Sequence, residues 1–258
     1  MTADLPKLAE ETSEHTHILK VMLVSDDCHA YWRNVDQTLP IATRAATAFA
    51  QRWFGAKSEA RVQNLVKVIS SRFDAYPSAL SLLHAWGTVP PDIRPLICHW
   101  HTQLSDPIYR RFSGVYLPDR RMSGLTQVDR DLVARWVQGQ FPGRWTPITC
   151  LKFASNMLSV AHEAGLVAQR RDPRDLVRPK VPDLAIAYLL YLLRGIQFEG
   201  TLLDNPYLRS VGLGEETLVQ RLRTVPGIGY HSLGGAHDVE WQFNDLQDWG
   251  RHTQEVAA

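Results

Sequence analysis

Apolar residues return at intervals of three and four along most of this chain, and proline, glycine or a capping side chain marks the ends of the stretches that carry them. Ile41, Ala45 and Ala48 give this pattern between Pro40 and Gly55. Because an α-helix turns once in 3.6 residues, side chains at such intervals share one face. With 45% hydrophobic residues the chain can bury such faces, so the sequence predicts a folded, mostly α protein.

The same periodicity predicts further helices and one hairpin. The expected helices cover 58–73, 77–86, 92–104, 107–116, 126 to the break at Pro142, 146–164, 184–197 and 215–223. Residues 226–243, rich in glycine and histidine, predict a β-hairpin with Gly234 and Gly235 at its turn. The apolar piece 17–24 fits either a helix or a strand.

Breaks in the pattern predict two parts joined by a linker. Residues 1–14 are polar and acidic and predict a disordered tail, followed by a helical part over 15–117. Residues 118–125, rich in charge and helix breakers, predict the linker. The second part is expected over 126–250, with a short tail at 251–258.

Residues 126–178 have the element order of a winged-helix variant of the helix-turn-helix. A capping-box pattern at Thr126 opens one helix, Pro142 breaks the chain, and Thr146 caps a second helix that Gly165 ends. Two short strands, 166–169 and 176–178, then enclose a basic loop. In such a module the second helix lies in the major groove of DNA, and the loop, or wing, touches the phosphate backbone.

Charge is unevenly spread although the net charge is only +1. Residues 41–180 hold 20 basic and 10 acidic side chains, whereas the segments on either side hold more acidic than basic ones. Most of the basic residues are arginines, whose planar guanidinium suits phosphate, so this segment predicts a polyanionic partner. The residues expected to contact DNA are Arg44, Arg52, Arg61, Lys67, Thr146, Thr149, Lys152, Ser155, Asn156, Arg170, Arg171, Arg174, Arg178 and Lys180.

No catalytic, metal or cofactor site is predicted. His99 and His101 lie two positions apart on an expected helix and therefore point about 200° apart, so they do not bind one ion together. The chain has no Gly-x-Ser-x-Gly elbow and no phosphate-binding P-loop. The sequence therefore favours binding over catalysis.

Cysteine use and hydropathy bear on location. The three cysteines are too few and too scattered for a disulfide framework, which indicates a reducing compartment. Residues 1–20 carry several glutamates and lack the apolar run of a secretory signal. The longest apolar stretch, 184–193, is half as long as the roughly 20 residues that a spanning helix needs. We expect a cytoplasmic protein without membrane contact.

Three stretches, taken in order, carry a resemblance to a known family. The first is an early helix pair with Thr43-Arg44-Ala45-Ala46 and the later Arg61 and Arg72. The second is Ser-Asn-Met-Leu-Ser-Val-Ala-His-Glu-Ala-Gly-Leu-Val over 155–167. The third is Tyr-Leu-Leu-Tyr-Leu-Leu over 188–193, followed by Gly200-Thr-Leu-Leu-Asp and Asn205-Pro-Tyr-Leu. In this order they resemble BrxA, a small accessory protein of bacterial BREX phage-exclusion systems, over roughly residues 15–250.

The resemblance implies a largely helical protein with a NusB-like helical part that binds DNA without catalysis. It also implies action beside the methyltransferase and ATPase components of the defence system. None of the shared stretches is a catalytic signature, and the family offers no motif by which single residues carry over. The contact residues named above therefore rest on the winged-helix pattern and the charge.

The sequence thus predicts a non-catalytic protein whose partners are double-stranded DNA and other components of a phage-defence system, and homo-oligomerisation stays open. One alternative is an interaction adaptor whose basic face docks an acidic protein, because helix–helix–hairpin units also serve as docking modules. A second is RNA binding, because a NusB-like helical body binds RNA elsewhere. A nuclease or other enzyme is the third alternative.

Overall fold

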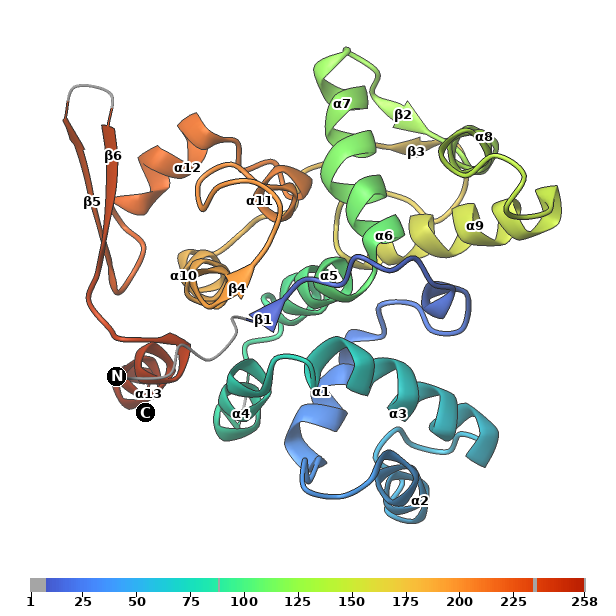
Figure 1. The fold of residues 1–258 in the computed structure, drawn as a ribbon, viewed down its shortest axis with the longest axis horizontal. Coiled ribbons are helices and arrows are strands. Elements are labelled where there is room, and N and C mark those ends of the chain that lie inside the picture. The colour runs from blue at the N-terminus through green and yellow to red at the C-terminus, as the bar shows by residue number, and fades with distance from the viewer. Residues whose placement is uncertain (1–7, 88, 234–235, 258) are drawn as a thin grey trace.

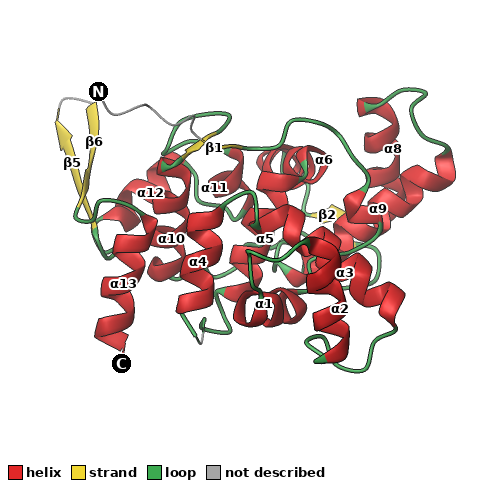
Figure 2. Cartoon of the chain, turned by 60° about the horizontal axis from the view of Figure 1, so that its bottom comes forward, coloured by secondary structure: helices red, strands yellow, loops and turns green. Residues whose placement is uncertain are grey.

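Helices make up most of the structure, a computed structural model that describes residues 8–87, 89–233 and 236–257 (Figures 1 and 2). The predicted mostly α fold class is confirmed. The strands within these ranges are short and form three separate pairs.

The first half of the chain is a series of amphipathic helices. Its elements are η1 (His17–Leu19), α1 (Ser25–Asn34), α2 (Ile41–Ala50), α3 (Glu59–Phe73), α4 (Pro77–Ala85) and α5 (Arg94–Ser105). The Ser58 hydroxyl accepts a hydrogen bond from the backbone N–H of Arg61 and so caps α3, as its sequence predicts. In the piece 17–24 only the 3₁₀ turn η1 is helical, and the rest leads into α1.

One continuous helical rod follows, made of α6 (Pro107–Arg111), the π-helical turn η2 (Phe112–Tyr116) and α7 (Leu117–Met122). The expected linker over 118–125 is therefore wrong for its first part, because α7 continues to Met122 and its first two residues, Leu117 and Pro118, are buried in the protein. A proline within a helix removes a backbone hydrogen bond. Burial of these two apolar side chains offsets that loss, which the sequence pattern alone does not reveal.

The second half adds α8 (Arg130–Gln140), α9 (Pro147–Glu163), α10 (Asp183–Arg194), α11 (Pro206–Ser210), α12 (Glu215–Leu222) and α13 (Leu246–Ala257). The expected helix start at Thr126 is wrong, because Gln127–Val128 forms strand β2. The Asp129 carboxylate instead caps α8, accepting from the N–H of Leu132 at 2.7 Å.

Both chain ends depart from the expected tails. Strand β1 (Leu8–Ala9) pairs in parallel with β4 (Ile196–Gln197), so residues 8–14 are held against the body, whereas residues 1–7 lie outside the described residues. At the other end α13 continues through the expected tail to Ala257. The predicted hairpin is present as β5 (Ile228–Leu233) and β6 (Ala236–Trp241), and its expected turn at 234–235 lies outside the described residues.

A single contiguous core joins the two predicted parts. Buried apolar side chains run from Ile18 to Trp249 in one cluster. Across the expected boundary, α4 packs on α13, α5 packs on α10, and η2 packs on α11. Helix α5 lies in the middle of the molecule, with helices from both halves around it (Figure 1). The chain folds as interleaved halves, and the segment 118–125 does not separate them.

Candidate nucleic-acid interface

Residues 117–177 have the topology of a winged-helix unit. Strand β3 (Arg174–Asp175) lies between two neighbours, pairing antiparallel with β2 on one side. On the other side Val167 forms an antiparallel bridge with Leu176. Helices α8 and α9 pack against each other beside these strands (Figure 1). The order helix, strand, two helices, strand and strand is that of a winged helix, and it includes a first strand that the sequence pattern did not indicate.

The wing, residues 169–173, is fixed to the start of α8. The Asp172 carboxylate accepts from the backbone N–H of Arg130 at 3.1 Å and from Nε of Arg174 at 2.8 Å. Gln169 Nε2 donates to the carbonyl of Pro173 at 2.9 Å. A carboxylate at a helix N-terminus is stabilised by the helix dipole, so the wing tip has a defined position beside α8.

Two of the predicted wing arginines are available for a partner. Arg170 and Arg171 are exposed, and neither forms an ion pair within the described ranges. Arg174 is only 7% exposed and its charge is paired with Asp172, so its expected contact with DNA is wrong. Arg130 was missed by sequence reasoning. Arg130 is exposed beside the wing. The only sequence feature that could have indicated it is the capping aspartate directly before it, Asp129, which marks the start of α8.

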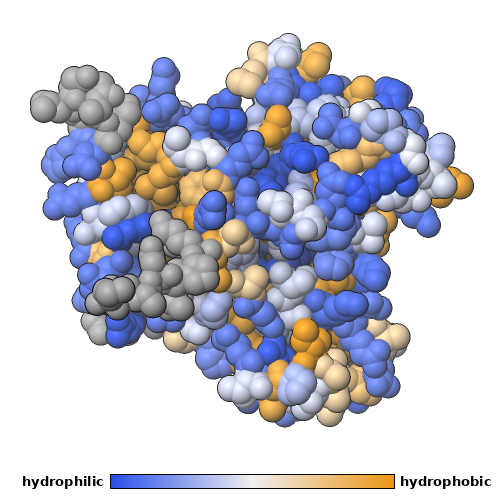
Figure 3. Space-filling model, in the orientation of Figure 1, coloured by the Kyte–Doolittle hydropathy of each residue, from blue (hydrophilic) through white to orange (hydrophobic). Residues whose placement is uncertain are grey.

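Helix α9 presents one stripe toward solvent, formed by Ile148, Lys152, Ser155 and Ser159. Lys152 is its only charged member, and Ser155 and Ser159 are half-buried. At the start of the helix the Thr146 hydroxyl accepts from the N–H of Thr149 at 3.3 Å, and the two hydroxyl oxygens lie 3.0 Å apart. The two predicted threonines therefore form the helix cap. Hydrophilic residues predominate on the side of the molecule around α8 and α9, with some apolar residues among them (Figure 3).

The neighbouring side of α9 is covered by the N-terminal segment. Asn156 Nδ2 donates to the carbonyl of Ile18 at 2.9 Å, so its expected role in base contact is wrong. Two turns further along the same face of α9, the Glu163 carboxylate accepts from the backbone N–H groups of Val24 and Ser25, at 3.1 and 2.8 Å, at the start of α1. The N-terminal segment, some 138 residues away along the chain, thus forms hydrogen bonds with polar side chains of α9 that have no partner in the sequence pattern.

Arg44 is also removed from the predicted contact set. The residue is only 7% exposed, and its side chain is held inside the first half of the chain. The guanidinium donates to the carbonyls of Leu39 and Gln37, each at 2.7 Å, and pairs with the carboxylate of Asp74. A buried arginine needs such partners because an unpaired buried charge is costly.

A second group of cations gathers where α3 approaches the 17–20 segment. Arg61 Nη1 donates to the carbonyl of Lys20 at 2.9 Å, and Lys67 is exposed on the same helix. Burial, followed by the positive charges of His15, Lys20 and Lys67, lowers the pKa of His17 to about 4. This cationic seam, formed by Lys20, Arg61 and Lys67 around His17, borders α9 because η1 packs on that helix. No sequence pattern indicated Lys20 as a contact residue.

The remaining predicted residues lie elsewhere. Arg52 is exposed in the turn after α2, with a positive φ of 54°. Arg178 and Lys180 follow β3, at the end of the strand opposite the wing tip, and both are exposed. The predicted set therefore divides into the wing with α9, the cationic seam, and separate cations, with Arg44, Asn156 and Arg174 withdrawn.

The paired histidines of α5 serve the core. His99 lies 2.8 Å from both Tyr109 Oη and Ser210 Oγ, and His101 lies 2.7 Å from Tyr188 Oη. Burial lowers the pKa of His99 to about 3 and that of His101 to about 4, so both are neutral at pH 7. In the described part of the chain no three His, Cys, Asp or Glu side chains gather as a metal ion requires.

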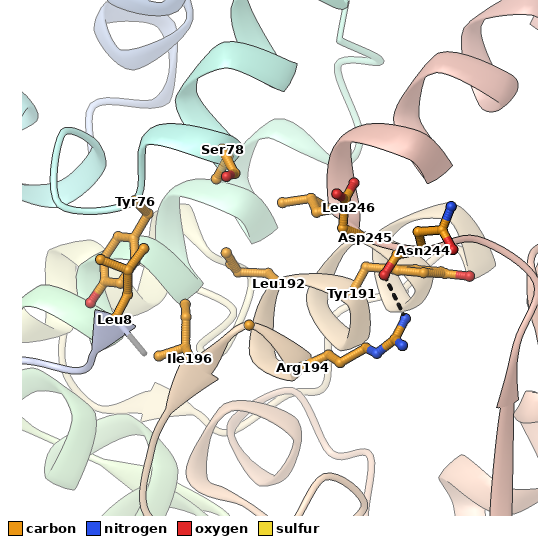
Figure 4. A pocket seen from close by; sticks show the side chains of 12 residues that line it. Leu8, Tyr76, Ser78, Tyr191, Leu192, Arg194, Ile196, Asn244, Asp245 and Leu246 are labelled. Atoms are coloured by element: carbon orange, nitrogen blue, oxygen red, sulfur yellow. Dashed lines mark hydrogen bonds between the residues drawn. The ribbon is translucent and has the colours of Figure 1, made fainter. Parts of the chain in front are cut away.

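A hollow of about 220 Å³ lies between α4, α10 and α13 (Figure 4). Its lining combines apolar side chains such as Leu192 and Ile196 with Ser78, Asp245 and Arg194. The Arg194 guanidinium is turned to the carbonyl of Asn244 at 3.0 Å, shown dashed in Figure 4. The lining contains no histidine or cysteine, and it presents no nucleophile paired with a base.

The chain matches no protein-family model and no curated protein sequence. Among the described residues, no helix has both the length and the apolar character needed to cross a lipid bilayer. The fold defines a mostly α protein with a winged-helix-like unit.

Proposed function

We propose that this protein binds double-stranded DNA through its winged-helix unit and catalyses no reaction itself. The observation that carries the proposal is a wing fixed against α8 by Asp172, with Arg170 and Arg171 exposed on it and without ion pairs in the described ranges. The α9 stripe, with the exposed Lys152 and the half-buried Ser155, lies in the same unit. A planar guanidinium on a fixed support is suited to phosphate.

The balance of side chains favours binding with little sequence preference. Arginines on the wing neutralise phosphates, which are the same for every sequence. The α9 stripe offers one lysine and two serines to base edges, a small set for direct readout. Duplex RNA is the weaker candidate, since the narrow major groove of an A-form helix does not admit a helix such as α9.

Fluorescence anisotropy with a short labelled duplex tests the proposal. If about 5 phosphates are neutralised, log K falls with log salt at a slope of roughly −4 to −5. Arg170→Glu combined with Arg171→Glu is expected to weaken binding at least about tenfold and to make the slope shallower by about 2.

Arg33→Glu combined with Arg223→Glu is the matched control. It changes the net charge equally, at exposed positions in α1 and at the end of α12. Equal losses in the two double variants, or no binding of the parent protein at low salt, would contradict the proposal. If a matched RNA duplex competes for the protein more strongly than the DNA duplex does, the ligand is RNA and not DNA.

We further propose that the protein serves as an accessory of a BREX-type phage-defence system. The support is the resemblance carried by the early helix pair with residues 43–46, Arg61 and Arg72, by residues 155–167, and by residues 188–193 with 200–208. A host that carries the complete system tests this proposal. The wing variant is expected to restore phage plating, and the charge-matched control is expected to leave protection intact.

A further inference from the structure

A second surface feature of the winged-helix unit lies at the end of β3 opposite the wing tip. It is an open groove of about 420 Å³ between the end of α7 and the β3 segment. Its lining comprises Arg121, Gly124, Leu125, Thr126, Leu176, Val177 and Arg178. The lining contains two cations and no carboxylate. We call it the α7–β3 groove.

Arg121 forms one wall of the α7–β3 groove and is held by backbone carbonyls alone. Its guanidinium donates to Val177 at 2.7 Å, to Leu166 at 3.2 Å and to Ser210 at 3.3 Å. Its Nε is buried without a hydrogen-bond partner. Burial, followed by repulsion from the positive charge of Arg178, lowers the pKa of Arg121 to about 10.

Arg178 is held beside it by a glycine. Gly212 has a φ of +80°, and a Cβ there would lie 2.6 Å from Cδ of Arg178, so the arginine stem packs where a side chain would otherwise stand. Arg178 is exposed, and neither it nor Arg121 forms an ion pair with another described residue. An anion placed between them would relieve their repulsion and gain charge-assisted hydrogen bonds.

The remainder of the groove is apolar. Leu176 and Val177 contribute to its lining, Leu125 is 47% exposed, and the adjacent Met122 is 78% exposed. A DNA phosphate backbone gains little from such a surface, whereas a peptide that combines an apolar side chain with a carboxylate gains from both parts. Exposed apolar surface rimmed by charge is typical of protein docking sites.

We propose that the α7–β3 groove docks a segment of a partner protein in which an apolar side chain lies next to a carboxylate. The apolar side chain packs on Leu125 and Leu176, and the carboxylate accepts hydrogen bonds from Arg178 beside Arg121. This places protein docking and DNA contact at opposite ends of one strand. Docking in the α7–β3 groove does not require that the wing binds DNA.

Amide chemical-shift mapping on the full chain tests the docking site with a defined probe. The probe is the peptide acetyl-Leu-Asp-Leu-Asp-Leu-amide, and the controls replace Asp by Lys or Leu by Ser. Saturable shifts are expected at 124–126 and 176–178 with a dissociation constant of about 1 mM, typical of a short unoptimised peptide. Each control peptide is expected to bind at least about fivefold more weakly, because it lacks the charge or the apolar part.

Two variants make the test specific. Arg178→Glu is expected to weaken peptide binding at least about fivefold, and Arg170→Glu, an equal charge change on the wing, is expected to leave it unchanged. Absence of saturable shifts at about 5–10 mM peptide, roughly five to ten times the expected constant, or equal effects of the two variants, would overturn the proposal. If a DNA duplex shifts the same amides and Arg178→Glu abolishes DNA binding, the groove is a nucleic-acid contact instead. Anisotropy of the wing variant reports separately on the DNA proposal.

Discussion

At the scale of single residues, arginines that look alike in the sequence have different roles in the structure. Arg170 and Arg171 are exposed on the wing, whereas Arg174, three positions later, is buried against Asp172. Arg44 is buried as well and is paired with Asp74. A guanidinium removed from water must find fixed acceptors, so burial converts a candidate phosphate ligand into a structural residue.

Substitution of Arg44 by leucine is expected to lower the free energy of unfolding by about 2–4 kcal/mol. The change leaves the carbonyls of Gln37 and Leu39 without their donor and Asp74 without its cation. Urea denaturation measures the loss. DNA affinity, measured below the denaturation midpoint, is expected to stay within about twofold, since this side chain faces the interior. A stable variant with strongly reduced DNA affinity would return Arg44 to the interface.

Acid is expected to destabilise the protein through His99 and His101. Burial lowers their pKa values to about 3 and about 4, below the ordinary value of 6.5 that applies when the chain is unfolded. As pH falls from 6.5 toward 4, these two histidines bind protons in the unfolded chain but stay neutral in the folded one. Stability therefore falls in this window, by up to about 1.4 kcal/mol per pH unit for each histidine.

Urea denaturation at pH 7.5, 6.0 and 5.0 measures this dependence. His99→Gln keeps a polar side chain near Tyr109 and Ser210 but does not titrate. Its unfolding free energy is expected to depend less steeply on pH between 6.5 and 5 than that of the parent, whatever its stability at pH 7.5. Parallel curves for the two proteins would show that His99 does not contribute to the acid sensitivity.

At the scale of elements, the rod of α6, η2 and α7 depends on close approach to α11. Gly114, in the π-helical turn, is where the two meet, since a Cβ there would lie 2.5 Å from Cβ and 2.6 Å from the carbonyl oxygen of Pro206. Only a residue without a side chain fits at this distance. The sequence pattern suggests a linker close by and does not reveal this contact, because α11, which packs on the rod, comes from a distant part of the chain.

Gly114→Ala is therefore expected to destabilise the protein by about 1–3 kcal/mol through overpacking. Gly139→Ala is the matched control, because it lies in α8 with nothing within 4 Å of the added Cβ. The control is expected to be neutral or to stabilise by up to about 1 kcal/mol, as alanine is the better helix former. Thermal or urea unfolding distinguishes the two. Equal effects would argue against close packing of η2 on α11.

At the scale of the whole molecule, the N-terminal segment and the shared core join the two halves. Glu14 pairs with Arg111 at 3.1 Å and with Arg144, and β1 pairs with β4. Helices α4 and α5 bury apolar faces against α13 and α10. Such interleaving leaves neither half with a complete core of its own.

The full chain is accordingly expected to unfold in one cooperative step, with circular dichroism and tryptophan fluorescence giving coincident curves in urea. The fragment 15–117 is expected to lack a cooperative transition, because it would expose the faces that α10 and α13 cover. Two resolved transitions of the full chain, or a cooperatively folding fragment, would support two independent domains instead.

The sequence by itself determined most of the longer helices, the Ser58 and Thr146 caps and the helix–helix–wing order, because periodicity, prolines and capping side chains act over a few neighbouring residues. It did not indicate α1, α11 or α13. Only the tertiary structure decided which polar groups remain free. Asn156 donates a hydrogen bond to the Ile18 carbonyl, and Arg44 forms an ion pair with Asp74. The stem of Arg178 packs against Gly212. The physical reason is that the solvation of a charge or amide depends on whatever packs against it, and here that neighbour comes from 30 to 138 residues away along the chain.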